Sequence, residues 1–210
     1  SLKEITLPPS LAVVERCLFN GCYHLEKVSL PPTIVAIGDG AFQECSELTD
    51  ISLPQSLMFI GTSIFNQCQK LKKIEVPASV VKMGDGVFQK CSSLTDISIL
   101  SPLTSIKRFT FNQCSSLQSI ELPLTITSID PYAFNSCINL KHITLPPNLI
   151  STAKASFNNC RSLERIILPE KFVSIGDYSF SNCKSLKEII LPQSLTSIGG
   201  NAFFSCISLQ

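Results

Sequence analysis

The chain repeats one sequence pattern every 23 residues from end to end. Three columns of identical residues carry it without insertion or deletion: leucine from Leu2 to Leu209, phenylalanine from Phe19 to Phe203, and cysteine from Cys22 to Cys206. A fixed period of this length is typical of repeat proteins, in which each unit packs against its neighbours. The sequence therefore predicts one elongated repeat domain, residues 1–210, in which about nine full units run from Leu2 to Ser208.

The first third of each unit predicts a β-strand. It reads L-x-x-I-x-L-P, and apolar residues two positions apart, such as Ile189 and Leu191, indicate a short strand with one buried face. Proline then ends the strand because it has no N–H to donate to a continuing ladder. Unit five departs from the pattern, with Leu100 in place of the proline and Pro102 two residues later. We expect the strands of successive units to stack in parallel.

The rest of each unit predicts the return path of the chain. A second apolar pair, such as Leu195 and Ile198, predicts a second short strand or an extended turn. Glycines that we expect to form a left-handed or tight bend come next, at Gly38, Gly61, Gly84, Gly176 and Gly199. In the last third, for example residues 41–48, apolar side chains at i, i+1, i+4 and i+7 predict a short helix. The predicted fold is an α/β solenoid with a parallel β-sheet on the concave side and short helices or turns on the convex side.

The repeat unit resembles that of a known family. It reads C-x-x-L-x-x-I-x-L-P-x-S-L-x-x-I-G-x-x-A-F-x-x, and it resembles the BspA-like leucine-rich repeat, also called the treponemal type, over the whole chain. Members are typically surface proteins of oral bacteria and of mucosal protist parasites such as trichomonads and entamoebae, and some are credited with binding extracellular-matrix proteins. The resemblance implies a leucine-rich-repeat solenoid that is secreted or on the cell surface and binds a protein of the matrix or of a host surface. Units one, five and seven are among those that depart from the I-G pair, at Val14-Glu15, Ile106-Lys107 and Thr152-Ala153, where the bend is expected to differ.

Composition excludes several kinds of partner. The net charge is +1 and charged residues make up 16% of the chain, so no strong field attracts nucleic acid or an anionic membrane. No apolar run approaches the roughly 20 residues of a membrane helix, so we expect no direct membrane insertion. The opening stretch S-L-K-E-I-T-L lacks the regions of a signal peptide, so neither signal nor anchor is expected within this segment. The alternative to a surface adhesin is an intracellular scaffold or recognition protein, and a signal peptide or anchor in the full gene would decide between them.

Most of the ten cysteines belong to the repeat. A cysteine at constant spacing, three residues after a phenylalanine, is what a small buried residue facing the core would give. We predict buried reduced thiols, with occasional disulfides between stacked units as the alternative. Cys17 lies outside the column and is predicted either to be exposed or to pair with Cys22. The same regular spacing does not favour a zinc site, and we predict no metal.

The sequence offers no catalytic constellation. The two histidines, His24 and His142, lie far apart, and no glycine-rich phosphate-binding loop occurs. A single histidine on a strand is most often a solvated residue. We therefore predict a protein that is not an enzyme and needs no cofactor.

The strand residues that flank the inward isoleucine are the predicted binding surface, because solenoids bind partners on extended faces. In the C-terminal half the candidates are His142, Thr144, Arg165, Ile167, Glu188 and Ile190. Ile167 and Ile190 place apolar groups on an otherwise polar face, a mark of a contact site. The remaining candidates are Glu121 and, in the N-terminal half, Lys73, Glu75 and Asp96. Charges there alternate in sign between neighbouring strands, so simple cross-strand pairing is the alternative to binding.

The two ends of the sequence carry no polar capping unit. Repeat arrays normally need such caps for solubility. We therefore expect the chain to be a fragment of a longer array, or to associate end to end with other copies.

Overall fold

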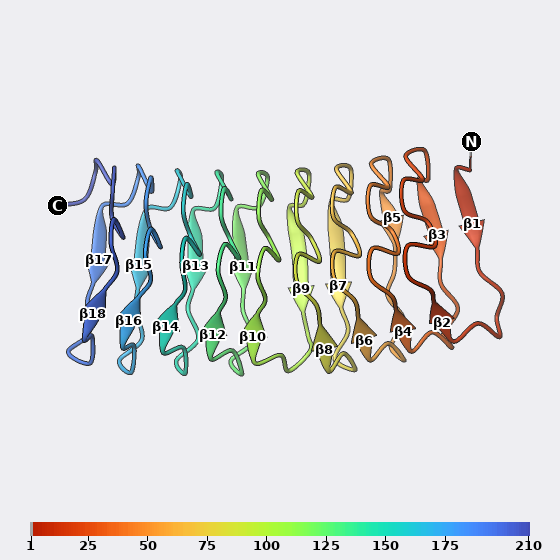
Figure 1. Ribbon diagram of the computed structural model, residues 1–210, viewed down its shortest axis with the longest axis horizontal. Helices are drawn as coiled ribbons and strands as arrows, with labels where there is room; N and C mark the ends of the chain where they lie inside the picture. Colours follow the sequence, from red (N-terminus) through yellow and green to blue (C-terminus); the bar gives the residue numbers. More distant parts are fainter. Residues whose placement is uncertain (1) are drawn as a thin grey trace.

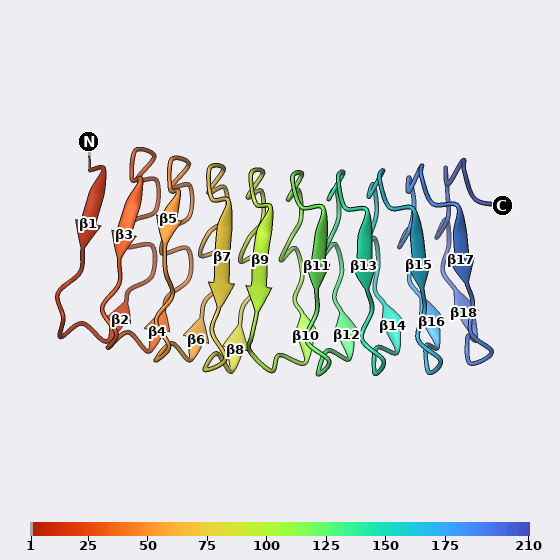
Figure 2. The ribbon, with the colours of Figure 1, turned by 180° about the vertical axis from the view of Figure 1, so that it is seen from behind.

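The computed structural model, which describes residues 2–210, is an elongated stack of coils with two short strands in each coil (Figure 1). One coil corresponds to one 23-residue unit, and coils are numbered here as the units. Odd-numbered strands form one row along the stack and even-numbered strands form the other, and the two termini lie at opposite ends (Figures 1 and 2). Ser1, the first residue of the predicted domain, lies outside the described residues.

The odd-numbered strands form where the L-x-x-I-x-L-P segments predict them. They are β1 (Glu4–Thr6), β3 (Lys27–Ser29), β5 (Asp50–Ile51), β7 (Lys73–Val76), β9 (Asp96–Ile99), β11 (Ser119–Glu121), β13 (His142–Thr144), β15 (Arg165–Ile167) and β17 (Glu188–Ile190). Paired strands are parallel and in register, so that Ile74 lies opposite Ile97. The middle residue points inward and its neighbours point outward. The predicted parallel stacking is confirmed.

The even-numbered strands confirm the second short strand of each unit. They are β2 (Val13–Val14), β4 (Ala36–Ile37), β6 (Phe59–Ile60), β8 (Lys82–Met83), β10 (Ser105–Ile106), β12 (Ser128–Ile129), β14 (Ser151–Thr152), β16 (Ser174–Ile175) and β18 (Ser197–Ile198). They form two parallel sheets, one from β2 to β8 and one from β10 to β18. The division between these sheets lies in unit five, where the proline is displaced.

The repeated phenylalanines form a continuous stack inside the solenoid. Neighbouring rings lie nearly parallel, with centroids 5.2 Å apart for Phe134 and Phe157 and 5.8 Å apart for Phe65 and Phe88. These separations fit offset stacking, which avoids placing the negative ring faces directly over one another. Full burial of each ring is worth about 1.5–3 kcal/mol. Because every coil adds one ring, the core grows by addition along the stack.

The last third of each unit forms a series of tight turns, and the predicted short helices are wrong. No helix occurs in residues 2–210. These residues therefore contain no helix that could cross a membrane. The Phe42 N–H donates to the carbonyl of Ile64 in the next coil (3.0 Å), whereas the Gln43 N–H donates to Gly40 within its own turn (3.0 Å). An α-helix needs each N–H to bond the carbonyl four residues earlier. The next coil takes every second N–H, and this excludes a helix.

Two positions in each coil adopt the left-handed backbone conformation that these turns require. One column begins at Cys17 (φ 54°) and the other at Gly21 (φ 73°), and most members of both are not glycine. Gly38 begins a tight turn, because the Ala41 N–H donates to its carbonyl (3.2 Å). None of the glycines predicted to form a left-handed or tight bend has a positive φ, so the left-handed alternative is wrong. They allow close approach instead: a Cβ on Gly38 would lie 2.6 Å from the backbone nitrogen of Arg16 in the preceding coil. A side chain is therefore excluded at Gly38 because it would clash with the preceding coil, and not because of the backbone φ angle.

Unit five is the main irregularity in the stack. Strand β9 extends to four residues, and Leu100, which replaces the proline, is exposed. Ser101 is fully buried, and within the described part of the chain its hydroxyl has no hydrogen-bond partner. Moving the proline by two residues shifts the turn that leads to β10. The even row is therefore interrupted between β8 and β10.

Candidate functional site

All ten predicted site residues lie on the odd-numbered strands with their side chains exposed, on the side of the molecule seen in Figure 2. We call this surface the strand face. It consists of the outward residues of β1 to β17, and the predicted members are Lys73, Glu75, Asp96, Glu121, His142, Thr144, Arg165, Ile167, Glu188 and Ile190. The alternation that predicts their outward direction is confirmed. Some of these ten residues form ion pairs with a neighbouring strand, and others line a common groove.

In the N-terminal half, charged side chains pair across neighbouring strands. Lys73 Nζ lies 3.1 Å from Asp96 Oδ2. Glu75 lies opposite Ser98 in the parallel register, and Glu121 shares a shallow pocket of about 300 Å³ with Asp96 between β9 and β11. For Lys73 and Asp96 the structure therefore supports the cross-strand pairing that the sequence leaves as the alternative to binding.

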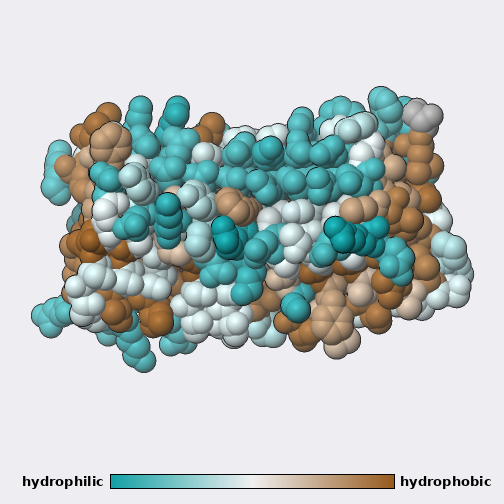
Figure 3. All heavy atoms as spheres, in the orientation of Figure 1, coloured by the Kyte–Doolittle hydropathy of each residue, from teal (hydrophilic) through white to brown (hydrophobic). Residues whose placement is uncertain are grey.

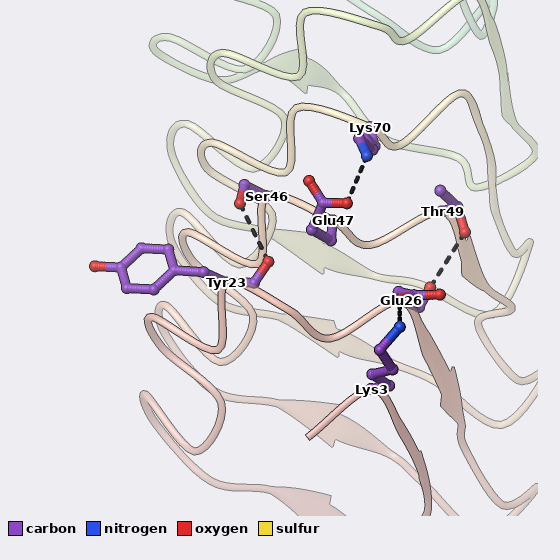
Figure 4. A network of polar contacts seen from close by, with 7 residues as sticks. All are labelled: Lys3, Tyr23, Glu26, Ser46, Glu47, Thr49 and Lys70. Atoms are coloured by element: carbon purple, nitrogen blue, oxygen red, sulfur yellow. Dashed lines mark hydrogen bonds and ion pairs between the residues drawn. The ribbon is translucent and has the colours of Figure 1, made fainter. Parts of the chain in front are cut away.

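Further polar contacts tie the first coils together at the edge of this face (Figure 4). Lys3 pairs with Glu26 at 3.0 Å, and the Glu26 carbonyl accepts a hydrogen bond from the Thr49 hydroxyl at 3.2 Å. Lys70 pairs with Glu47 in the same way. Each contact joins residues 23 positions apart in the sequence, which are equivalent sites in adjacent coils. Charges in this region are therefore largely compensated within the protein.

In the C-terminal half, four of the predicted residues line one groove. His142 and Thr144 on β13 and Arg165 and Ile167 on β15 contribute to a groove of about 610 Å³. The turn that follows each strand supplies the rest of the lining, namely Pro147, Asn148, Pro169, Glu170 and Lys171. Strands β13 and β15 belong to separate sheets, so the hydrogen-bonded ladder is interrupted under the groove.

A side-chain hydrogen bond that recurs in other coils is missing at this groove. In five coils the serine or threonine two residues after the proline site donates its hydroxyl to a backbone carbonyl of the preceding coil. These pairs are Thr33 to Leu11, Ser56 to Ile34, Ser79 to Leu57, Thr125 to Leu103 and Ser194 to Phe172, at 2.6–2.8 Å. Asn148 and Lys171 occupy this place in coils seven and eight, and neither makes such a bond within residues 2–210. The two turns therefore lack this side-chain bond to the preceding coil, and residues of both turns line the groove.

The groove combines an apolar middle with charged ends. Ile167 is 54% exposed and lies between proline turns. Arg165 Nε lies 3.3 Å from Glu188 Oε2, whereas Lys171 has no ion pair within the described residues. Ile190 lies beside Ile167 in the β15–β17 register, but Ile190 and Glu188 do not line the groove. The structure thus brings together four of the six C-terminal candidates and leaves two beside them.

Comparison with known proteins places the repeat in a family. The sequence profile described as the BspA type leucine rich repeat region matches residues 1–95 and 104–210 in six copies. The chain belongs to the BspA-type leucine-rich repeat family. The unmatched residues 96–103 lie in unit five and include the displaced proline. No curated protein sequence matches this BspA-type chain significantly.

Solved structures share its solenoid fold. A leucine-rich repeat protein from Bacteroides ovatus is 27% identical over 99% of this chain, with a TM-score of 0.85. A T. pallidum leucine rich repeat protein is 26% identical over 89% of this chain and 79% of its own, with a TM-score of 0.60. A leucine rich cell surface protein from Faecalibacterium prausnitzii is 23% identical over 100% of this chain and 78% of its own, with a TM-score of 0.54. The BspA-type chain spans 65% of the length of the B. ovatus protein.

The cysteine column of this BspA-type protein consists of free thiols that are buried except at its two ends, Cys22 and Cys206. None of the ten cysteines in the described residues forms a disulfide, and Cys45 to Cys183 are fully buried. From Cys45 to Cys206 each thiol in the column donates to a phenylalanine carbonyl of the preceding coil, as in Cys45 to Phe19 at 3.2 Å. Burial raises the pKa of Cys45 to about 12. Cys17 is exposed and unpaired with Cys22, and no group of three or more His, Cys, Asp or Glu residues in the described chain could hold a metal ion.

Sequence reasoning missed two features of the surface. The turn residues of the groove had a usable signal, because Asn148 and Lys171 break the proline-x-serine/threonine pattern. The second is an exposed apolar stripe along β2 to β8, visible as hydrophobic surface at the lower right of Figure 3. It consists of Val13, Val35, Met58, Phe59 and Val81. Its signal is compositional, since serine occupies the position of Val13 and Phe59 in every coil from coil five onward.

Proposed function

We propose that this chain is a non-enzymatic protein-binding module that holds its partner on the strand face, with the groove of coils seven and eight at the centre. The observation that carries this proposal is the convergence of His142, Thr144, Arg165 and Ile167 on one groove. An exposed isoleucine ringed by polar groups is characteristic of a contact site. Outward residues elsewhere on the strand face, such as Lys73 and Asp96, pair with each other.

We further propose that the protein acts at a cell surface, in adhesion or in interaction with a host. Family membership and the fold shared with a cell surface protein from F. prausnitzii motivate this part of the proposal. Proteins of the extracellular matrix and of host-cell surfaces are the partners that we consider first.

Binding to immobilised matrix proteins and to host cells tests the proposal. The double variant Ile167→Glu with Ile190→Glu should lose at least about tenfold in affinity, because it places two carboxylates on the contact surface. Both side chains are exposed, so the urea midpoint should stay close to that of the parent. Val81→Glu is the matched control, because Val81 is equally exposed but lies off the strand face. Full binding by the folded double variant would exclude the strand face as the binding surface.

A further inference from the structure

The groove of coils seven and eight has the dimensions of an extended peptide. Its lining follows the course of the coil, from His142 and Arg165 at the start of the strands, past Ile167, to Asn148 and Lys171 in the turns. Each of the two lining segments, residues 142–148 and 165–171, begins as a strand and ends in a turn. The volume of about 610 Å³ lies within the range of natural ligand pockets. A short extended segment fits this space better than a folded surface.

The middle of the groove suits an aliphatic side chain. Ile167 points outward between the turns that carry Pro147 and Pro169. These groups offer no hydrogen bond to a polar side chain. A leucine, isoleucine or valine of a partner would remove this apolar surface from water, which is the main favourable term in such contacts.

The charges at the ends of the groove favour an acidic segment. Arg165 and Lys171 line it against a single carboxylate, Glu170. Lys171 has no ion pair in the described residues, while Arg165 shares its charge with Glu188. The surrounding sequence points the same way, since residues 141–210 contain seven lysines and arginines against four acidic residues. Complementary charge of this kind guides partner choice and orientation.

We propose that the groove binds an extended acidic and aliphatic segment of a partner protein, with an aliphatic side chain on Ile167 and a carboxylate at Lys171. This inference rests on the proposed function and specifies the chemistry of its partner. The segment lies along the coil, with one carboxylate at the turn end of the groove. A basic segment of the same apolar content is not accommodated.

Labelled peptide pools of defined composition test this inference on the whole chain. Each pool consists of end-capped hexapeptides whose two central residues are Leu, Ile or Val, and whose outer residues are Asp/Glu, Lys/Arg or Ser/Gly. Fluorescence polarisation should show the acidic pool binding about tenfold more tightly than the basic pool. Ile167→Glu should reduce binding of the acidic pool about tenfold, and Lys171→Glu should remove the preference for acidic peptides. Equal binding of the acidic and basic pools, or unchanged binding by Ile167→Glu, would overturn the inference.

Matched variants separate the groove from general charge effects. Val81→Glu and Lys184→Glu make the same chemical changes at exposed positions outside the groove and should leave peptide binding unchanged. Comparable loss in Lys184→Glu would mean that overall charge decides binding, which contradicts the inference. If no pool binds but Ile167→Glu with Ile190→Glu still abolishes binding to a matrix or host protein, the proposed function stands and the extended-segment inference is wrong.

Discussion

Two regions of the solenoid, coils two and three and coils seven and eight, have the same backbone arrangement. They differ in which polar groups on their surfaces are paired. In the first region Lys27 pairs with Asp50 at 3.1 Å, and the hydroxyl of Ser56 ties its turn to the preceding coil. In the second region Asn148 and Lys171 replace that hydroxyl, and a groove opens beside Ile167. The first region pairs these surface groups within the protein, whereas in the second region Lys171 has no ion pair among the described residues.

The comparison shows where a repeat array can acquire a binding site. The leucine, phenylalanine and cysteine columns do not vary, because each side chain packs against its equivalent in the coils on both sides. Outward and turn positions vary at little cost to the core. We infer that a binding site can arise where both the hydroxyl bond between coils and the ion pair are missing. Within residues 2–210, both are missing at Lys171.

Removing a core ring should have the largest effect, and it should be equal in the two regions. Phe42 and Phe157 are both fully buried and stacked between two rings, so each change to alanine should cost about 3–5 kcal/mol through the cavity left behind. Urea unfolding of Phe42→Ala and Phe157→Ala measures the cost. A difference well above about 1 kcal/mol would show that the regions differ in the core as well as on the surface.

Alkaline pH should destabilise both regions through the buried cysteines. Burial raises the pKa of Cys45 to about 12 and that of Cys160 well above its usual range. Above about pH 8.5 the unfolded chain releases these protons and the folded chain keeps them, so stability is complete below that pH and falls as pH rises toward the folded pKa. Each cysteine contributes about 1.4 kcal/mol per pH unit to the fall.

Alanine variants isolate this contribution. Between pH 9 and pH 11 the free energy of unfolding should fall less steeply with pH in Cys45→Ala and in Cys160→Ala. The expected difference in slope is about 1.4 kcal/mol per pH unit for each variant. Cys17→Ala provides the control for removing an exposed thiol. An unchanged slope in both core variants would show that these thiols ionise as readily in the folded chain as in the unfolded one.

Exchanging the inter-coil hydroxyl between the regions should give a smaller effect of opposite sign. Ser56→Ala removes a 2.6 Å hydrogen bond to the Ile34 carbonyl and should cost about 0.5–1.5 kcal/mol. Lys171→Ser places a hydroxyl where it can bond the Leu149 carbonyl, and it should stabilise the chain by a similar amount while weakening partner binding. Urea midpoints and a binding assay measure both. Destabilisation by Lys171→Ser would show that the open turn of coil eight is set by something other than the missing hydroxyl.

Most of the fold could be predicted from the sequence because the period is uninterrupted. The strands, their parallel register and the buried Phe and Cys columns follow from residue alternation and spacing. The return path could not be predicted correctly, because helical spacing of residues 41–48 also suits consecutive tight turns. Hydrogen bonds to the next coil decide between a helix and tight turns, because every second N–H bonds to the next coil. The sequence of a single unit does not reveal these bonds.

The candidate site was only partly predictable. Outward strand residues such as Ile167 follow from alternation alone, and they are exposed as predicted. Their grouping into a groove depends on the turn residues Asn148 and Lys171, which lie outside the strand pattern. Departures from the repeat at turn positions are therefore a better signal for a site than outward strand residues alone.

Single charge removals should have the smallest effect on stability and the clearest difference in binding. Lys27 pairs with Asp50 at 3.1 Å and Arg165 with Glu188 at 3.3 Å, and all four side chains are about half exposed. Lys27→Met and Arg165→Met should each cost about 0.2–1 kcal/mol, because exposed ion pairs gain little over solvation and are screened by salt. Only Arg165→Met should weaken partner binding, since only Arg165 lines the groove. Urea unfolding at low and high salt and the binding assay together check this, and equal loss of binding in both variants would extend the contact surface to coil two.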